Sequence, residues 1–240
     1  MLALVVRFIL VLAVSLAFHV AYTRPSEATS KERLAVVGSE RFLHFVIKNL
    51  TLLKGFFWAL GVAEATSLAI DAFAPTHSSL RLSSIFLKFN PVLSVDNVKL
   101  SPLAVVGALL VIFGGWLRWE CYRTMKSLFT YELSIRDDHK LVTSGPYSVV
   151  RHPSYAAMLA VECGMYCWYA AEGSWLRESG LLDTSVGRVV TTVVAMYKMG
   201  IMVSLLRRVR VEDAELRKVF GAQWMEWARD VRYTIIPGII

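Results

Sequence analysis

The sequence HKLVTSGPYSVVRHPSY, residues His139–Tyr155, lies between two long apolar segments. It places an imidazole, a Gly-Pro turn, an aromatic residue and an Arg-His-Pro step directly before a hydrophobic helix. Polar side chains at a membrane boundary cost stability unless they bind something. The stretch therefore predicts a functional site at the start of a helix that begins near Pro153.

The composition indicates a membrane protein. Of 240 residues, 55% are hydrophobic and 19% are charged, whereas a soluble domain carries about a quarter charged residues. The apolar residues are grouped in blocks, as in membrane-spanning chains. The net charge of +7 fits cytoplasmic loops near anionic lipid. No recognition motif accompanies this charge, so we expect no nucleic-acid partner.

Five segments are long enough to cross a bilayer, which takes about 20 helical residues. They are Leu2–Tyr22, Phe45–Phe73, Pro102–Cys121, Pro153–Ala171 and Val186–Leu206. We therefore predict an all-α polytopic membrane helix bundle of about five transmembrane helices, with a small cytosolic C-terminal helical cap. The first segment resembles a signal peptide, but its long apolar stretch favours a retained helix. Residues 74–101 are expected to form a lumenal loop with a short amphipathic piece.

The positive charges predict the orientation. Seventeen Lys and Arg residues lie after the first and third spans and in the C-terminal tail, against five in the other two loops. Because positive loops stay cytoplasmic, we expect a cytosolic C-terminus. The sequon Asn49-Leu50-Thr51 then faces the cytosol, and we expect no glycan there.

The start of the fourth span has the features of an anion site. Pro153 suits the first helical position and drives His152 into an extended conformation. Arg151 and His152 then precede a helix N-terminus, where free N–H groups and the helix dipole attract anions. The alternative is that Arg151 only extends toward lipid headgroups.

The tail supplies carboxylates. Apolar residues recur at helical spacing between 205 and 227, namely Leu205, Val209, Leu216, Phe220 and Trp224. Glu212 and Asp213 fall on the same stripe, so at least one should point at the protein. An intrahelical pair of Arg208 with Glu212 is the simpler alternative. Gly221 is expected to end this helix, and a second amphipathic piece should follow from Gln223 to Val231.

Other polar residues lie inside the apolar segments. Glu64 and Glu162 either serve function or form interhelical bonds. The cysteines Cys121, Cys163 and Cys167 form no Cys-x-x-Cys pair, so we expect reduced thiols and no metal.

The C-terminal half resembles the isoprenylcysteine carboxyl methyltransferase family of membrane proteins. The family pattern H-x-L-V-x-x-G-x-Y…R-H-P-S-Y, followed one span later by R…E-E…L…F-G, matches residues across this chain. They are His139, Leu141, Val142, Gly145, Tyr147, Arg151, His152, Pro153, Ser154, Tyr155, Arg208, Glu212, Asp213, Leu216, Phe220 and Gly221. Phospholipid N-methyltransferases and some sterol reductases share parts of the pattern. Asp213 replaces the usual second Glu, and a Gln and Asn-Pro of the family are replaced near Tyr166 and Ala171-Glu172.

The resemblance implies S-adenosyl-L-methionine as cofactor and prenylated CaaX-type protein C-termini (farnesyl or geranylgeranyl cysteine) as substrates, in the endoplasmic reticulum membrane. It implies one methyltransferase domain over 1–240, with N-terminal spans in 1–120 and the cofactor- and substrate-binding part in 121–240. The implied cofactor-binding residues are His139, Leu141, Val142, Gly145, Tyr147, His152, Pro153, Tyr155, Glu212 and Asp213. The implied catalytic residues are Arg151 and Glu212.

The acceptor can be argued from its chemistry. A C-terminal carboxylate, with a pKa of about 3.5, is already anionic at neutral pH and needs a counter-charge rather than a base. Arg151 fits that role. An amine acceptor would need a base, for which Glu162 is a candidate. A non-enzymatic membrane protein, with a polar path through Glu64, Asp71 and Glu162, is the alternative outside enzymes.

Overall fold

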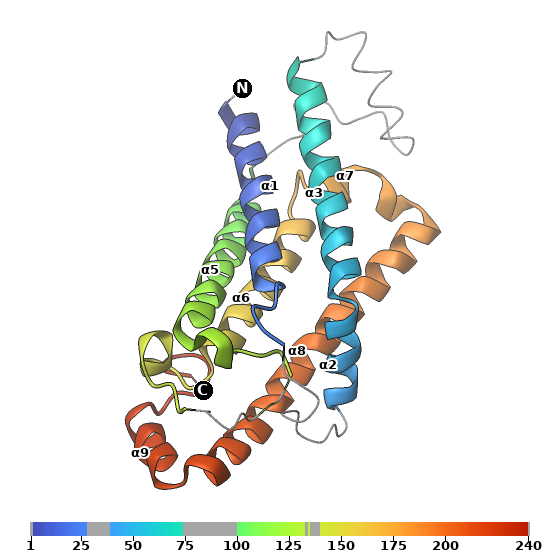
Figure 1. Ribbon diagram of the computed structural model, residues 1–240. Coiled ribbons are helices and arrows are strands. Elements are labelled where there is room, and N and C mark those ends of the chain that lie inside the picture. Colours follow the sequence, from blue (N-terminus) through green and yellow to red (C-terminus); the bar gives the residue numbers. More distant parts are fainter. Residues whose placement is uncertain (1, 28–38, 74–99, 133, 135–139, 240) are drawn as a thin grey trace. The chain divides into compact units, whose positions relative to one another are not determined.

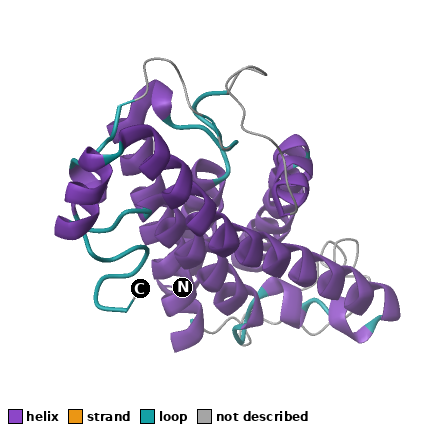
Figure 2. Ribbon diagram, turned by 90° about the horizontal axis from the view of Figure 1, so that it is seen from below, coloured by secondary structure: helices purple, strands orange, loops and turns teal. Residues whose placement is uncertain are grey.

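The protein is described from a computed structural model, which covers residues 2–27, 39–73, 100–132, 134 and 140–239. Within these residues the regular elements are helical (Figure 2), which confirms the all-α class. Figure 1 labels the helices. Their bounds are α1 Leu2–Ala21, α2 Ser39–Lys48, α3 Leu50–Phe73, α5 Pro102–Met125, α6 Pro153–Ala170, α7 Trp175–Glu178, α8 Ser185–Phe220 and α9 Ala222–Asp230. The 3₁₀ turns are η2 Lys126–Leu128, η3 Gly145–Ser148 and η4 Leu181–Asp183.

Four of the described helices are long and apolar enough to cross a membrane: α1, α3, α5 extended through η2, and α8. By helix composition the chain is therefore a multi-pass membrane protein. The predicted fourth span forms α6 as a helix of 18 residues, but it is not among these four. Glu162 and four aromatic residues with polar atoms lower its hydropathy; they are Tyr155, Tyr166, Trp168 and Tyr169.

Two other boundaries differ from the sequence prediction. The predicted span Phe45–Phe73 is divided into α2 and α3 at Asn49, whose side-chain amide donates to the carbonyl of Phe45 at 2.8 Å. The predicted fifth span and the tail helix form one helix, α8, of 36 residues. It ends at Phe220, and Gly221 has a φ of +51°, as expected for a glycine after a helix. Residues 74–99 of the predicted loop 74–101 lie outside the described residues.

The chain divides into two compact units. The first unit comprises Met1–His19, Leu52–Ile112 and Val161–Lys198, and the second comprises Val20–Thr51, Phe113–Ala160 and Met199–Ile240. Each is described by itself below.

The first unit contains two buried ion pairs. Arg7 of α1 contacts Glu64 of α3 at 2.6 Å, and its guanidinium lies 5.1 Å from the centroid of the Trp168 ring. Lys198 of α8 contacts Glu162 of α6 at 2.9 Å. The two acids singled out in the sequence thus form interhelical ion pairs, as the simpler of the two interpretations held.

Helices α5 and α6 also approach closely in the first unit. A Cβ on Gly164 would lie 2.7 Å from the carbonyl oxygen of Gly107, and one on Gly107 would lie 2.8 Å from that of Gly164. These distances are shorter than real Cβ contacts. The absence of side chains at both positions therefore permits this packing.

The second unit has two apolar clusters of buried residues. One joins α5, η3 and α9, through Cys121, Phe129, Tyr147, Trp227 and Val231. The other joins α6, α8 and the C-terminal tail, through Tyr155, Val209 and Ile235. Burial of these side chains fixes the signature stretch against the tail.

Candidate active site

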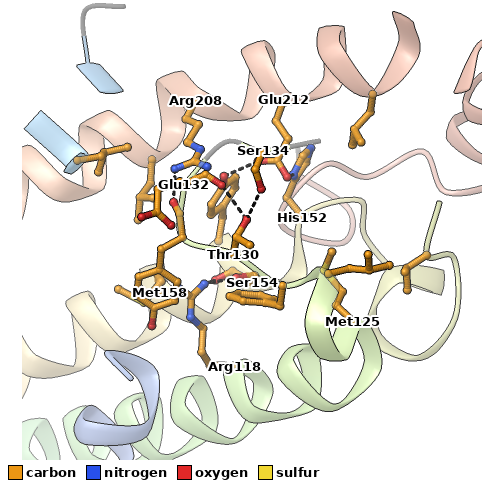
Figure 3. A pocket seen from close by; sticks show the side chains of 18 of the residues that line it. Arg118, Met125, Thr130, Glu132, Ser134, His152, Ser154, Met158, Arg208 and Glu212 are labelled. Carbon is orange, nitrogen blue, oxygen red and sulfur yellow. Dashed lines mark hydrogen bonds and ion pairs between the residues drawn. The ribbon is translucent and has the colours of Figure 1, made fainter. Parts of the chain in front are cut away.

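A pocket lies within the second unit. Its lining comes from Tyr22, α2, the first residue of α3, α5, the stretch between α5 and α6, the start of α6, α8, and Trp227 of α9. In Figure 3, Arg208 and Glu212 of α8 lie on one side of the pocket, and Arg118 of α5 lies on the other. The signature stretch and the acidic part of the tail, far apart in sequence, therefore line one pocket.

The acidic residues of α8 contact the signature residues directly. Nε2 of His152 lies 2.9 Å from Oδ1 of Asp213, and the hydroxyl of Tyr155 donates to Oε2 of Glu212 at 2.5 Å. The rings of His152 and Tyr155 are stacked, with 5.4 Å between centroids and 8° between planes. Both acids thus point toward protein, because their helix face packs on the first turn of α6.

Tyr147 is held in the wall of the pocket. Its hydroxyl donates to Sδ of Met125 at 2.8 Å, and its carbonyl accepts from Nε1 of Trp227 at 3.2 Å. Burial raises the pKa of the Tyr147 phenol well above its ordinary value, and the nearby Cys121 and Glu212 add to the effect. The phenol is therefore neutral at physiological pH.

The other residues of the signature fall into three groups. Leu141 and Val142 line the pocket. Gly145 and Pro153 shape the backbone: Gly145 has a φ of +60°, which favours glycine, and Pro153 is the first residue of α6. His139 lies outside the described residues.

Arg151 lines the pocket but contacts mainly protein. Its guanidinium donates to the carbonyls of Val231 and Arg232 at 3.0 and 2.9 Å and to Oγ1 of Thr234 at 2.8 Å. It also contacts Oδ2 of Asp213 at 3.4 Å. The predicted anion-binding arginine is therefore bound to the tail.

Arg118 was not singled out from the sequence, yet it lines the pocket and is only 6% exposed. It donates to the carbonyls of Ala21 and Ser154 and to the Ser154 hydroxyl. The rings of Tyr122, Phe129 and Tyr131 lie 4.8–5.5 Å from its guanidinium carbon. Among the described residues, no carboxylate lies within ion-pair distance of it. A buried cation is normally paired, so an anionic ligand would complete its surroundings.

Glu132 and Arg208 add charges that the signature pattern did not assign to the pocket. Glu132 is buried and lines the pocket, while Nη1 of Arg208 donates to the Tyr131 carbonyl at 2.6 Å. The sequence signal available for Glu132 was a lone acid within the apolar stretch around residue 130.

In the part of the chain described, no three His, Cys, Asp or Glu side chains gather as a metal site would require.

Thr130, Ser134, Lys140 and Glu215 also line the pocket, and apolar side chains form another part of its lining. This apolar part is contributed by α2, α3, α6 and α8, through Leu43, Val46, Ile47, Leu50, Met158, Ile201 and Leu205. The same cavity thus combines a charged part with a hydrocarbon part. A ligand that carries a polar head and an aliphatic chain matches both.

Several known proteins resemble this chain in sequence. Residues 106–171 match the model of the Isoprenylcysteine carboxyl methyltransferase (ICMT) family. A Protein-S-isoprenylcysteine O-methyltransferase of Xenopus laevis is 28% identical over 69% of this chain and 53% of its own length. The Homo sapiens protein of that name is 27% identical over 71% and 56%. Protein-S-isoprenylcysteine O-methyltransferase B of Arabidopsis thaliana is 30% identical over 52% and 55%. No solved structure matches the chain.

The helices and the pocket define a multi-pass membrane protein with a mixed polar and apolar site. Through residues 106–171 the chain is similar to the isoprenylcysteine carboxyl methyltransferase family, and the curated relatives above carry a corresponding name. It spans about half the length of the curated relatives it matches.

Proposed function

We propose that this protein uses S-adenosyl-L-methionine to methylate the C-terminal carboxylate of isoprenylated cysteine. The observation that carries the proposal is the composition of one pocket, whose lining combines the carboxylates of Glu132, Glu212 and Glu215 and the buried guanidinium of Arg118 with apolar side chains. The family's printed name supports the same reaction. From the resemblance and the charge distribution, we place the protein in the endoplasmic reticulum membrane with its C-terminus cytosolic.

The charged part of the pocket fits the cofactor. When bound, S-adenosylmethionine would supply an electrophilic methyl group on a sulfonium. Glu212 of the pocket lining, or Asp213 beside it in α8, would hold its ammonium group or ribose hydroxyls through charge-assisted hydrogen bonds. The stacked faces of His152 and Tyr155 lie beside these acids. An aromatic face near a cation contributes about 0.5–2 kcal/mol.

The guanidinium of Arg118 fits the acceptor. Transfer of a methyl group to a carboxylate forms an O–C bond and breaks a C–S bond, and no proton has to move. The protein must therefore position the carboxylate and balance its charge. Arg118 is buried in the pocket wall, and no carboxylate among the described side chains pairs with it. We assign the acceptor carboxylate to Arg118, where the sequence had suggested Arg151.

The apolar lining fits the prenyl chain. Burial of a farnesyl group against Leu43, Val46, Ile201 and Leu205 would contribute about 25 cal/mol for each Å² removed from water. Part of this surface comes from α2, an amphipathic helix that directly precedes the span-length helix α3. A substrate of this kind would arrive dissolved in the bilayer, which explains a methyl transfer by a membrane protein.

Methylation of an amine, such as a phospholipid headgroup, is the alternative. It requires a base, and the sequence offered Glu162. That carboxylate is fully buried and contacts Lys198 at 2.9 Å, so its charge is used in an ion pair. Because Glu162 is paired with Lys198, we favour a carboxylate acceptor, which needs no base.

The test is methyl transfer in membranes that contain this protein as the sole methyltransferase. With N-acetyl-S-farnesylcysteine as acceptor, we expect a base-labile methyl ester. The matched control is the same compound with its carboxylate converted to an amide, which should accept no methyl group. Methylated phospholipid headgroups and unmodified farnesylcysteine would contradict the proposal.

A further inference from the structure

We propose that residues Val231–Ile235, here called the C-terminal strap, form part of the active site, and that Arg151 is the positioning residue that fastens them. The inference rests on the proposed function only where activity and cofactor binding are measured; the attachment of the strap by Arg151 does not depend on it. The strap residues were not part of the predicted site, and Arg151 was expected to contact the substrate.

The hydrogen bonds of Arg151 carry the proposal. A guanidinium has five N–H donors. Nη1 donates to the carbonyls of Val231 and Arg232, and Nη2 donates to Thr234 Oγ1 and contacts Asp213 Oδ2. Only Nε, which is buried, has no hydrogen-bond partner among the described residues. Both terminal nitrogens are therefore engaged, and bidentate binding of a substrate carboxylate would require breaking these bonds.

The backbone reinforces the same attachment. The amide of Arg151 donates to the Tyr233 carbonyl at 3.0 Å, and the amide of His152 donates to the Thr234 carbonyl at 2.8 Å. The first helical N–H groups of α6 and those just before it would otherwise need other partners. Backbone carbonyls of the strap thus accept hydrogen bonds just before the N-terminus of α6, where the sequence had predicted that an anionic ligand would bind.

The end of the strap is anchored by burial. Ile235 is 3% exposed and packs with Tyr155 and Val209. Tyr155 is the residue whose hydroxyl donates to Glu212. The strap therefore contacts Arg151 and His152. At its end, Ile235 packs against the ring of Tyr155, which contacts Glu212 of α8.

Arg151 and Arg118 therefore have different roles. Arg151 holds the strap and Asp213, and thereby fixes the His152 ring against the acids that would bind the cofactor. Arg118 remains to meet the acceptor. Loss of the strap should therefore weaken cofactor binding and turnover, whereas the affinity for the prenylated substrate should be retained.

The experiment compares Thr234→Val, which removes one acceptor at constant shape, with Thr234→Ser, which restores it. Arg151→Gln is the second variant, and Arg229→Ala is the matched control, because Arg229 lies outside the strap and its side chain is 73% exposed. Three quantities are measured on the full-length protein in detergent. They are binding of labelled S-adenosylmethionine, hydrogen exchange of amides 231–235, and kcat and KM for N-acetyl-S-farnesylcysteine.

We expect Thr234→Val and Arg151→Gln to weaken cofactor binding about tenfold or more, the effect of losing a hydrogen bond to a charged group. Exchange in the strap should accelerate, while the KM for farnesylcysteine should stay unchanged. Thr234→Ser, which keeps the hydroxyl, and Arg229→Ala should behave as wild type. The proposal is overturned if Arg151→Gln raises that KM while strap exchange and cofactor binding stay normal. It is also overturned if Thr234→Val leaves exchange unchanged. If the wild type binds no S-adenosylmethionine, the proposed function fails, and the exchange rates alone decide whether Arg151 fastens the strap.

Discussion

Nε2 of His152 lies 2.9 Å from Oδ1 of Asp213, although 60 other residues separate them in the sequence. This contact joins the signature stretch to the acidic turn of α8, the two parts of the chain that the family pattern had picked out. It brings the start of one helix and the polar end of another to the same pocket. The proposed chemistry depends on this juxtaposition.

Arg118 should be essential for transfer and dispensable for cofactor binding. We expect Arg118→Gln to reduce kcat/KM for farnesylcysteine by about a hundredfold or more, as loss of a preorganised donor does. Binding of labelled S-adenosylmethionine should change by less than about threefold. Arg123→Gln is the matched control, since the Arg123 side chain is 60% exposed and pairs with Glu120. Wild-type transfer by Arg118→Gln would remove this residue from the proposed mechanism.

The ion pair of Arg7 with Glu64 should matter for stability. Glu64→Gln removes the carboxylate that pairs with the fully buried Arg7, which should cost about 3–5 kcal/mol. The double variant Arg7→Met/Glu64→Leu should recover most of that loss. The measurement is the thermal unfolding midpoint in detergent, with Glu120→Gln, from a partly exposed pair, expected to cost less than about 1 kcal/mol. A single variant as stable as wild type would show that this pair contributes nothing.

Gly164 should not tolerate a methyl group. A Cβ there would meet the backbone of Gly107 at 2.7 Å and of Val111 at 2.8 Å, so α5 and α6 would have to separate. We expect Gly164→Ala to destabilise by about 1–3 kcal/mol. Gly55→Ala is the control, because a Cβ on Gly55 meets nothing within 4 Å and alanine favours the helix by about 0.5–1 kcal/mol. Equal unfolding midpoints for the two variants would contradict the close packing.

Asn49 tests the orientation inferred from the positive charges. The residue lies between α2 and α3, and its sequon should face the cytosol, where no oligosaccharide is added. Expression in microsomes should therefore give no shift in mobility on glycosidase treatment. A sequon introduced within residues 74–99, which are expected to be lumenal, is the positive control. A glycan on Asn49 would reverse the predicted topology.

Local signals predicted the boundaries of individual elements well. Pro153 begins α6, and Gly221 follows the end of α8, because a proline at a first helical position and a glycine after a last one have direct backbone causes. The break at Asn49 was missed, since the apolar stretch runs across it and hydropathy does not register a helix cap.

The pocket could be predicted only in part. Helical periodicity predicted that at least one of Glu212 and Asp213 points toward the protein, and Glu212 lines the pocket. Arg118 was not singled out, since an arginine near the end of a span commonly reaches for headgroups, and only the fold shows it beside three aromatic rings. The contacts of Arg151 with the strap use backbone carbonyls, which every residue possesses, so no side-chain pattern could have indicated them.

The central claim is that the part of the pocket around His152, Tyr155 and Glu212 binds S-adenosylmethionine. Its most direct test is equilibrium binding of the labelled cofactor to purified wild-type protein, Glu212→Gln and the exposed control Glu226→Gln. We predict saturable binding by wild type and by Glu226→Gln, and affinity reduced about tenfold or more in Glu212→Gln, through loss of a charge-assisted hydrogen bond. Equal binding by all three proteins, or no binding by wild type, would contradict the account.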